Sequence, residues 1–324
     1  MRAIQVTAFG DPEVLSLAEL PDPVPGPGQV VVGMAAADII FLDTLLRSGW
    51  GQDYFPRTLP YVPGGGGAGA VVETGEGVDP AWFGRHVVVR TSSGYAERVV
   101  ADVEEIVPIP EGLAIEVAAA LVHDGVTALS LDRLGTPEKG EWTVVSAAAG
   151  GAGSLLVQLA VDAGARVVAA ASSAAKLALA RKLGAEIAVD YTRSDWIHRV
   201  RDATGGGAAL VYDGAGGPLG TATLDAVADG GRFVTYGTAG GLAAPDPESA
   251  ALRGIRVFAP LLDGPPDQET VRELLSLALE QAAKGRLRPA IGAIYPLERA
   301  ADAHRALAAR TTVGKSLLLV GDDS

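Results

Sequence analysis

The sequence contains no cysteine, and this absence alone removes several classes of chemistry. Disulfide bonds, thiolate nucleophiles, and zinc or iron–sulfur centres held by cysteine are all excluded. No uninterrupted apolar run approaches the roughly 18 residues that a membrane-spanning helix needs. The first residues also lack the apolar stretch that is typical of a signal peptide. We therefore expect a soluble, cytosolic protein.

The sequence also lacks any cluster of basic residues. It carries 26 Lys and Arg against 39 Asp and Glu, which gives a formal net charge of −13. This balance argues against a nucleic acid or an anionic membrane as partner, although a small anionic ligand in a local site is compatible with it. Hydrophobic residues make up 48% of the 324 residues, which is enough for large cores in one or two domains.

The order of sequence patterns predicts a β-rich segment followed by an α/β segment. Short runs rich in β-branched residues, separated by Pro- and Gly-containing turns, occupy residues 30–39, 68–75, 85–91 and 95–110. After a helical stretch that starts at about Ile115, strands and helices alternate, which is typical of a doubly wound parallel sheet. A helix, a strand, a helix and a last strand follow, and we expect them to pack onto the first domain.

One strand–turn–helix segment carries a nucleotide-binding pattern. It reads VVSAAAGGAGSLLVQLA, with Ala147, Gly150 and Gly153 at the spacing of an A-x-x-G-x-x-G turn. Glycines there let the backbone approach a pyrophosphate, and a helix starting at Ser154 would direct N–H groups and the positive end of its dipole toward it. The alternative is a tight turn without a ligand. Because strand and helix flank the turn in the required order, we favour a dinucleotide site.

The second strand of this unit ends without an acidic residue. NAD-binding units usually carry Asp or Glu about 20 residues after the glycine turn. Here the strand ends VVAAASSAAK, where Ser172 and Ser173 offer hydroxyls and Lys176 offers a positive charge. A lysine in the first turn of a helix is unfavourable with respect to the helix dipole, which favours a functional role over a solvated surface residue. These groups suit a 2′-phosphate, so the sequence predicts NADPH as the cofactor.

Several motifs spread over nearly the whole chain are specific in combination. They are FLDTLLRSG, LPYVPGGGGAGAVVETGEGV, SGYAERVV, AAALVHDGVTAL, AAAGGAGSLLVQLA, KLALARKLGAEIAVDY, VYDGAGG, GGRFVTYG and VGKSLLL. In these motifs the chain resembles the zinc-free quinone oxidoreductases, the zeta-crystallin-like group of the medium-chain dehydrogenases/reductases. The resemblance implies a GroES-like catalytic domain at 1–122 and 263–324, with a Rossmann NADPH-binding domain at 123–262 between its two parts. It also implies a homodimer, for which the predicted strand at 254–260 could extend a sheet.

The resemblance assigns roles to individual residues of the cofactor site. Lys176 and Tyr191 match the pair that contacts the 2′-phosphate, and Thr127 matches a residue near the nicotinamide. For Tyr191 the alternative is an aromatic residue that stacks on the sheet edge. The complete set of expected cofactor contacts is Thr127, Ala149, Gly150, Gly151, Ala152, Gly153, Ser172, Ser173, Lys176, Tyr191, Gly214, Gly237 and Thr238.

Four consecutive glycines at 64–67 stand where the zinc-containing relatives look like G-H-E, with the His as a metal ligand. This chain has no imidazole there, and His86, His123, His198 and His304 do not show metal-ligand spacing. We therefore expect no metal. We interpret the glycine run as the floor of a substrate cleft, and a plain turn before a strand is the alternative.

The chain departs from its relatives in the stretch IIFLDTLLRSG. Many relatives carry Asn and Tyr where this chain has Ile40 and Leu45, which suggests a more hydrophobic substrate. The remaining catalytic candidates are Asp43, Tyr54 and His123. His123 could deliver a proton because the ordinary pKa of imidazole is near neutrality, and Tyr54 could donate to a carbonyl. The alternatives are that Asp43 braces its loop, Tyr54 packs its loop, and His123 caps a helix.

Three functions are compatible with these observations. The favoured one is an NADPH-dependent reductase that transfers hydride, without a metal, to a small hydrophobic quinone or α,β-unsaturated carbonyl. A metal-free alcohol or polyol dehydrogenase is less favoured, because oxidation of a hydroxyl needs a metal or a strong base. The third is a nucleotide-binding protein with little turnover and a scaffolding or other non-redox role, which the apolar Ile40 and Leu45 keep open.

Overall fold

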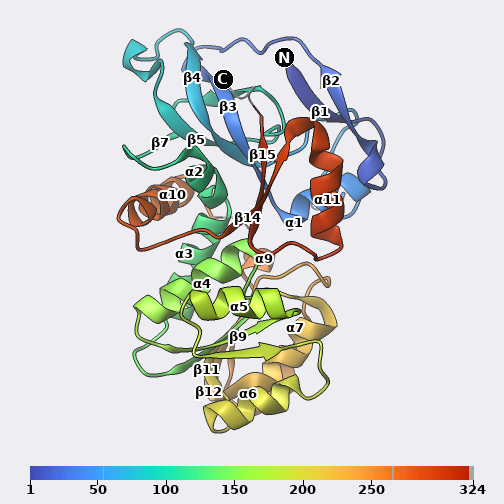
Figure 1. Cartoon of the computed structure of the whole chain (residues 1–324), viewed down its shortest axis with the longest axis vertical. Helices are drawn as coiled ribbons and strands as arrows, with labels where there is room; N and C mark the ends of the chain where they lie inside the picture. Colours follow the sequence, from blue (N-terminus) through green and yellow to red (C-terminus); the bar gives the residue numbers. More distant parts are fainter. Residues whose placement is uncertain (54, 265, 321–324) are drawn as a thin grey trace. The chain divides into compact units, whose positions relative to one another are not determined.

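Two compact units make up the computed structural model, which describes residues 1–53, 55–264 and 266–320 (Figure 1). Unit 1 comprises Met1–Val126 and Gln268–Ser324, and unit 2 comprises Thr127–Asp267. These boundaries lie a few residues further along the chain than the predicted ones at 122/123 and 262/263. His123 consequently belongs to unit 1.

A seven-stranded sheet is the framework of unit 1, in the order β14–β15–β3–β4–β5–β7, with β6 also paired to β3. Its strands are β3 (Gln29–Ile39), β4 (Gly66–Thr74), β5 (His86–Arg90), β6 (Arg98–Asp102), β7 (Val107–Pro108), β14 (Ile291–Pro296) and β15 (Lys315–Leu319). β15 pairs antiparallel with β3. The C-terminal segment therefore completes a sheet that the first third of the chain begins, as Figure 1 shows by the contact of red and blue strands.

The helices of unit 1 pack around this sheet. They are α1 (Phe41–Ser48), α2 (Ile115–Leu121), α10 (Gln268–Ala283) and α11 (Ala300–Ala308), with 3-10 turns η1 (Pro12–Val14), η2 (Pro80–Trp82) and η4 (Leu297–Arg299). The helical stretch predicted from about Ile115 is helical in the structure, but as two helices instead of one continuous run. The chain breaks at Val122 and His123, and α3 (Asp124–Gly135) then begins. The helical pattern of the sequence continues through this break. In the structure, His123 lies at the break and is hydrogen-bonded to Asp38 of β3.

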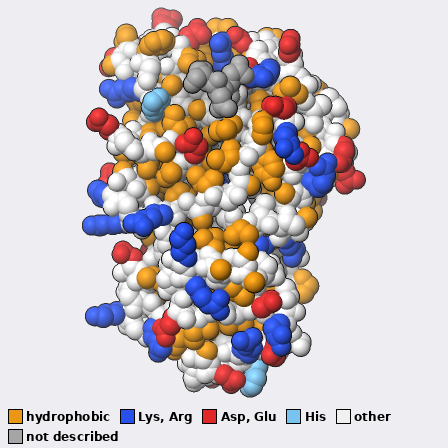
Figure 2. All heavy atoms as spheres, viewed as in Figure 1, with side chains coloured by type: hydrophobic (Ala, Val, Ile, Leu, Met, Phe, Trp, Pro, Cys, Tyr) orange, Lys and Arg blue, Asp and Glu red, His pale blue; other side chains and the backbone are white. Residues whose placement is uncertain are grey.

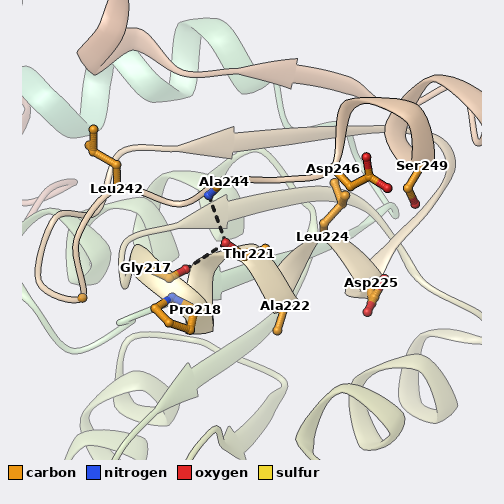
Figure 3. Close-up of a pocket in the computed structure, with 11 residues that line it drawn as sticks. Gly217, Pro218, Thr221, Ala222, Leu224, Asp225, Leu242, Ala244, Asp246 and Ser249 are labelled. Atoms are coloured by element: carbon orange, nitrogen blue, oxygen red, sulfur yellow. Dashed lines mark hydrogen bonds between the residues drawn. The ribbon is translucent and has the colours of Figure 1, made fainter.

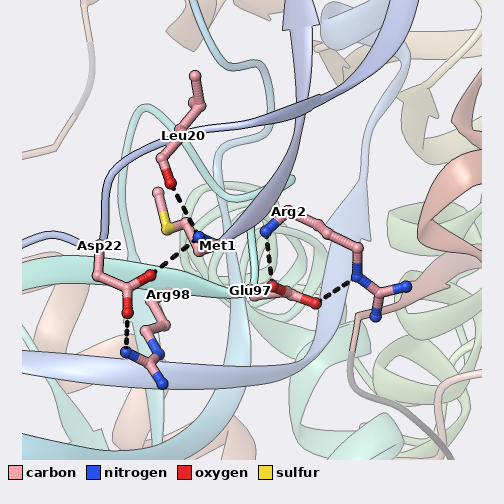
Figure 4. Close-up of polar contacts among 6 residues, drawn as sticks. All are labelled: Met1, Arg2, Leu20, Asp22, Glu97 and Arg98. Atoms are coloured by element: carbon pink, nitrogen blue, oxygen red, sulfur yellow. Dashed lines mark hydrogen bonds and ion pairs between the residues drawn. The ribbon is translucent and has the colours of Figure 1, made fainter.

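A two-stranded sheet holds the N-terminal segment against the rest of unit 1. It consists of β1 (Arg2–Val6) and β2 (Leu15–Glu19). Figure 4 shows how side chains reinforce it: the Met1 amino group pairs with Asp22 at 2.9 Å, and the backbone N–H and Nε of Arg2 both donate to Glu97 at 2.6 Å. The N–H of Ile4 also donates to the carbonyl of Tyr95. These contacts fix the segment that carries the buried Tyr95 side chain.

Unit 2 is built on a six-stranded sheet in the order β10–β9–β8–β11–β12–β13, whose pairings are all parallel. Its strands are β8 (Trp142–Ser146), β9 (Arg166–Ala171), β10 (Ile187–Asp190), β11 (Ala208–Asp213), β12 (Val227–Thr235) and β13 (Arg256–Phe258). The chain runs outward through β9 and β10 and then returns to β11 beside β8. In such sheets ligands bind at the carboxyl ends of the two strands where the order reverses, here β8 and β11.

Helices connect the parallel strands of unit 2, as the alternating pattern predicts. Besides most of α3, they are α4 (Gly151–Asp162), α5 (Ala174–Lys182), α6 (Trp196–Thr204), α7 (Gly217–Thr223), η3 (Leu224–Ala226), α8 (Pro247–Leu252) and α9 (Pro260–Asp263). The segment GTATLDAVADG has a helical sequence pattern, but it is helical only as far as Ala226, because β12 already begins at Val227. Val227 pairs with Ala208 of β11, so strand pairing overrides the local helical pattern.

The surface agrees with the mixed charge of the sequence. On the face shown in Figure 2, basic and acidic side chains are interspersed over both units, with apolar side chains between them. A helix both long and apolar enough to span a bilayer is not found among the described residues. The cytosolic location stays a prediction.

Candidate functional site

The predicted nucleotide turn lies between β8 and α4 in unit 2. Gly150 is the N-cap of α4, which begins at Gly151 and not at the predicted Ser154. A Cβ atom on Gly153 would lie 2.4 Å from the carbonyl oxygen of Ala147, so only glycine lets the helix approach the turn this closely. Gly151, Ala152 and Gly153 therefore form the first turn of α4. Their N–H groups are those that a helix N-terminus offers to an anion.

Asp213, at the end of β11, joins this turn to two neighbouring strand ends. Its buried carboxylate accepts the Ser146 hydroxyl of β8 at 3.0 Å and the Thr235 hydroxyl of β12 at 2.9 Å. It also accepts the backbone N–H groups of Ala215 and Gly216, at 3.0 and 3.2 Å. One carboxylate thus fixes the carboxyl ends of β8, β11 and β12 together.

The structure brings Gly214 and Gly237 together at these strand ends. A Cβ on Gly237 would lie 2.2 Å from the carbonyl carbon of Gly214, so the two backbones touch. The Gly214 N–H donates to the Ser146 hydroxyl at 3.0 Å. Thr238 follows directly, and its carbonyl accepts the Gly241 N–H at 3.0 Å. These predicted residues consequently lie beside the strand that leads into the glycine turn, whereas Thr127 lies apart from them in the sequence, in the first turn of α3.

A second group of predicted residues gathers at the ends of β9 and β10. The Lys176 ammonium donates to the Ser172 hydroxyl at 3.2 Å, and Ser173 is the N-cap of α5. The Tyr191 N–H donates to the carbonyl of Ala171, the last residue of β9, because β9 and β10 are paired. The four predicted residues Ser172, Ser173, Lys176 and Tyr191 thus share one corner of unit 2. The Tyr191 ring also packs edge-to-face on Trp196, with 6.4 Å between ring centroids.

A hollow of about 650 Å³ lies elsewhere in unit 2, between α7, η3 and the loop that leads to α8 (Figure 3). Thr221 links two of its walls, since its hydroxyl donates to the Gly217 carbonyl and accepts the Ala244 N–H. The acidic side chains of Asp225 and Asp246 line it, and none of the predicted cofactor residues does. Two carboxylates do not suit a phosphate, so we do not assign the cofactor to this hollow.

In unit 1, His123 and Asp38 form a hydrogen-bonded pair. The distance between His123 Nδ1 and Asp38 Oδ2 is 2.7 Å. The Asp38 side chain is fully buried, whereas 15% of the His123 side chain is exposed. Lys315 and the His123 side chain lower the pKa of Asp38 against the effect of burial. An ionised carboxylate can only accept hydrogen bonds, so His123 Nδ1 is the donor.

Two further charged residues extend this pair. The Lys315 ammonium contacts Asp38 Oδ1 and lies 2.8 Å from Asp124 Oδ2. Lys315 is almost completely buried, and its two carboxylate partners raise its pKa above the ordinary value despite the burial. His123, Asp38, Lys315 and Asp124 therefore form one connected cluster of polar groups, which we call the His123 cluster.

Asp43 lies in a separate buried network. Its carboxylate accepts the Ile40 N–H at the start of α1 and the Tyr95 hydroxyl, each at 3.0 Å, and the Tyr95 oxygen lies 3.0 Å from His304 Nε2. Burial raises the pKa of Asp43 to about 6. These contacts are those of a residue that braces α1, and we propose no proton transfer for it. Tyr54, the remaining catalytic candidate, lies outside the described residues.

Comparisons with known proteins agree with this geometry. The alcohol dehydrogenase GroES-like domain matches residues 26–111, and the zinc-binding dehydrogenase domain matches residues 151–280. A probable quinone oxidoreductase of Schizosaccharomyces pombe is 34% identical, over 99% of this chain and 97% of that protein. A 2-haloacrylate reductase of a Burkholderia species is 31% identical, over 96% of both chains. The structure of Escherichia coli quinone oxidoreductase complexed with NADPH matches with a TM-score of 0.89 at 29% identity, over 98% of this chain and 100% of that one.

The chain belongs to the quinone oxidoreductases of the medium-chain dehydrogenase/reductase family. It is therefore an oxidoreductase of a nicotinamide-dependent family, and the predicted combination of a GroES-like domain and a Rossmann domain is confirmed.

Each of the four glycines at 64–67 lies against a different neighbour. A Cβ on Gly64 would lie 2.3 Å from the Tyr95 ring, and one on Gly66 or Gly67 would lie within 2.4 Å of a backbone carbonyl oxygen. These three positions are filled by the chain itself and do not form an open floor, which corrects the cleft interpretation. Gly65 differs, because its Cβ would lie 2.6 Å from the His123 imidazole.

By the resemblance described above, Gly65 matches the position of the histidine in the G-H-E of the zinc-containing relatives. In this chain the His123 imidazole packs against that position instead. Among the described residues, no group of three or more His, Asp and Glu side chains could hold a metal ion. Metal independence stays a prediction.

Sequence reasoning missed Asp38 and Lys315. Asp38 ends the run VVVGMAAAD within an otherwise apolar strand, and an acid in such a run signals a buried partner. Lys315 opens the equally apolar run KSLLLV. Both signals were present, but the pairing of β3 with β15 was needed to join them.

Proposed function

We propose that this protein uses NADPH to reduce a quinone or an activated alkene without a metal, with His123 as the proton donor. Bound NADPH supplies a hydride, which carries two electrons to an electron-poor carbon of the acceptor. Negative charge then develops on the acceptor oxygen, and one proton completes the hydroquinone or the reduced carbonyl compound. The observation that carries the proposal is the His123–Asp38 pair, in which Nδ1 is occupied and Nε2 is left for a proton.

The preference for NADPH is argued from one corner of unit 2. Ser172, Lys176 and Tyr191 gather at the ends of β9 and β10, and β9 ends without the acidic residue that would hold a ribose 2′-hydroxyl. A lysine ammonium and a hydroxyl are the groups that a 2′-phosphate needs. The E. coli relative complexed with NADPH is consistent with this assignment.

Cofactor choice is tested by calorimetric titration with NADPH and NADH. A charged hydrogen bond contributes about 1.5–3 kcal/mol, so Lys176→Ala should weaken NADPH binding roughly 10- to 100-fold and leave NADH nearly unchanged. Lys182→Ala, an exposed lysine at the other end of α5, is the matched control. Equal losses for both cofactors would contradict a contact with the 2′-phosphate.

Proton donation is tested by stopped-flow oxidation of NADPH with an ortho-quinone and an enone. General acid catalysis typically contributes a factor of about 100 to 10,000, so His123→Gln should lower kcat by at least about 100-fold. His198→Gln is the control, because this histidine is exposed and pairs with the exposed Asp202. Cofactor binding without turnover of any acceptor would favour the nucleotide-binding, non-redox alternative.

We also propose that the protein is a homodimer joined through β13. This strand ends the sheet of unit 2, and Val257 within it is partly exposed. Leu252 and Leu262, on either side of the strand in sequence, are 88% and 72% exposed. An edge strand between exposed leucines can be covered by a second copy, which would extend the sheet across a two-fold axis.

A further inference from the structure

The His123 cluster contains more than an ion pair needs. Asp38 and Lys315 alone would neutralise each other in the buried sheet. Instead Asp38 uses its two oxygens for different partners, with Oδ2 toward His123 and Oδ1 toward Lys315. Lys315 in turn is held from a second direction by Asp124 at 2.8 Å. The carboxylate therefore cannot rotate away from the imidazole without breaking its contact with the lysine.

The backbone explains why these groups meet. Asp38 of β3 pairs with Leu317 of β15, so Lys315 lies two residues along on the same face of the sheet. His123 is placed by the break between α2 and α3, and α2 packs on β3, β4 and β15. Asp124 is the next residue in the chain. Three separate elements thus converge on one imidazole.

Along the chain of contacts from Lys315 through Asp38 to His123, the imidazole is the exposed member; Asp124, on the other side of Lys315, is 16% exposed. Asp38 is fully buried and Lys315 is 4% exposed, whereas His123 retains 15% exposure and packs against the bare backbone of Gly65. With Nδ1 bound to Asp38, the neutral ring carries its only hydrogen there. Nε2 is then the atom that gains a proton to form the imidazolium and gives it up again.

We propose that Asp38 and Lys315 are positioning residues that hold His123 in the Nδ1–H tautomer, so that Nε2 alone carries the transferred proton. The inference rests on the proposed function and adds two residues to it. Lys315 acts through Asp38, and Asp38 acts through His123, so neither touches the reacting atoms. Loss of Asp38 frees Nδ1, and part of the population then takes the tautomer with its hydrogen on Nε2.

The tautomer can be measured directly, without turnover. The chain has four histidines, so nitrogen-15 NMR of protein labelled in histidine gives few signals, each assigned by its His→Gln variant. At a pH where the ring is neutral, we expect pyrrole-like Nδ1 and pyridine-like Nε2 for His123 in the unaltered protein. The reverse pattern would overturn the proposal. This measurement is made on the unaltered protein, so it does not depend on the folding of a variant.

Asp38→Asn is the variant that isolates the positioning effect. Its amide retains the shape of the side chain, and we expect a mixture of His123 tautomers, with kcat lowered about 10- to 100-fold and NADPH affinity unchanged. Asp202→Asn, beside the exposed His198, is the matched control and should change neither the His123 tautomer nor kcat. An unchanged His123 spectrum in folded Asp38→Asn would contradict the proposal.

A double variant separates this inference from the proposed function. If Asp38 acts only through His123, Asp38→Asn should cost nothing further in kcat when made in His123→Gln. Equal additional loss in both backgrounds would show that Asp38 acts independently and would overturn the inference. Full activity of His123→Gln would instead contradict proton donation by His123. The tautomer measurement would still decide whether Asp38 determines the tautomer of the His123 ring.

Discussion

At the residue scale, the missing side chain of Gly65 leaves room for the His123 imidazole. A methyl group on Gly65 would overlap the His123 imidazole, with 2.6 Å between the nearest atoms. We expect Gly65→Ala to displace the ring, to lower kcat at least 10-fold and to cost about 1–3 kcal/mol of stability, as overpacking does. Steady-state kinetics and urea unfolding measure the two effects.

Gly77→Ala is the control for this substitution. Gly77 has a positive φ and no neighbouring atom near its missing Cβ. Alanine there should cost about 1 kcal/mol through backbone strain and leave kcat unchanged. A Gly65→Ala enzyme with normal kcat would show that the position of the imidazole against Gly65 does not matter.

The buried His304 should make the stability of the protein depend on pH. Burial lowers its pKa to about 3, so the folded protein keeps the ring neutral where the unfolded chain, with a pKa of 6.5, takes up a proton. The unfolded state then binds more protons between pH 6.5 and 3, and stability falls as the pH falls through this window. The loss is up to about 1.4 kcal/mol per pH unit.

Replacing the ring isolates this contribution. His304→Gln should be less stable than the unaltered protein at pH 7.5, and the gap should narrow at pH 4.5. Asp43, whose raised pKa of about 6 gives the opposite slope, contributes to both proteins and cancels in the difference. Urea unfolding at the two pH values measures the gap, and a constant gap would contradict a neutral buried imidazole.

At the scale of the elements, Asp213 is the junction of three strand ends. Its carboxylate accepts hydrogen bonds from β8, from β12 and from the turn that follows β11. In Asp213→Asn the hydrogen bonds to a charged carboxylate become weaker neutral ones, and the Thr235 hydroxyl must turn to accept from the amide N–H₂, at a cost of about 1–3 kcal/mol. We expect that loss of stability together with about 10-fold weaker NADPH binding, measured by urea unfolding and calorimetry.

Thr235→Val tests how far this effect is local. It removes one donor at Oδ2 and leaves the contacts of Oδ1 with Ser146 and the turn intact. We expect a smaller loss of stability and normal NADPH binding. If Asp213→Asn also bound NADPH normally, the strand junction would not position the glycine turn.

At the scale of the whole molecule, the homodimer proposal concerns the edge of unit 2. Carboxylates at Leu252 and Leu262 would place charge in the proposed interface, so the double variant Leu252→Glu, Leu262→Glu should sediment as a monomer. Phe83→Glu, at an apolar side chain of unit 1 that is 66% exposed, is the control and should leave a dimer. A dimer that survives the double variant would place the interface elsewhere.

The sequence by itself determined the architecture of unit 2 and the family. The glycine spacing after a strand, the alternation of strands and helices, and the motifs along the chain depend on local order, which sequence patterns record. Lys176, Ser172 and Tyr191 were also singled out from the sequence, and their contact with the cofactor stays a prediction. The first two lie on one strand–helix connection, and Tyr191 follows the adjacent strand.

The tertiary structure alone decided the His123 cluster. Its members come from β3, from the break after α2 and from β15 at the far end of the chain, so no spacing in the sequence connects Asp38 with Lys315. The same reason accounts for the break at His123 and for the early start of β12, because both follow from contacts with other strands. Local patterns specify individual helices and strands. The partners of a buried charge are decided only when the strands that carry them pair with one another.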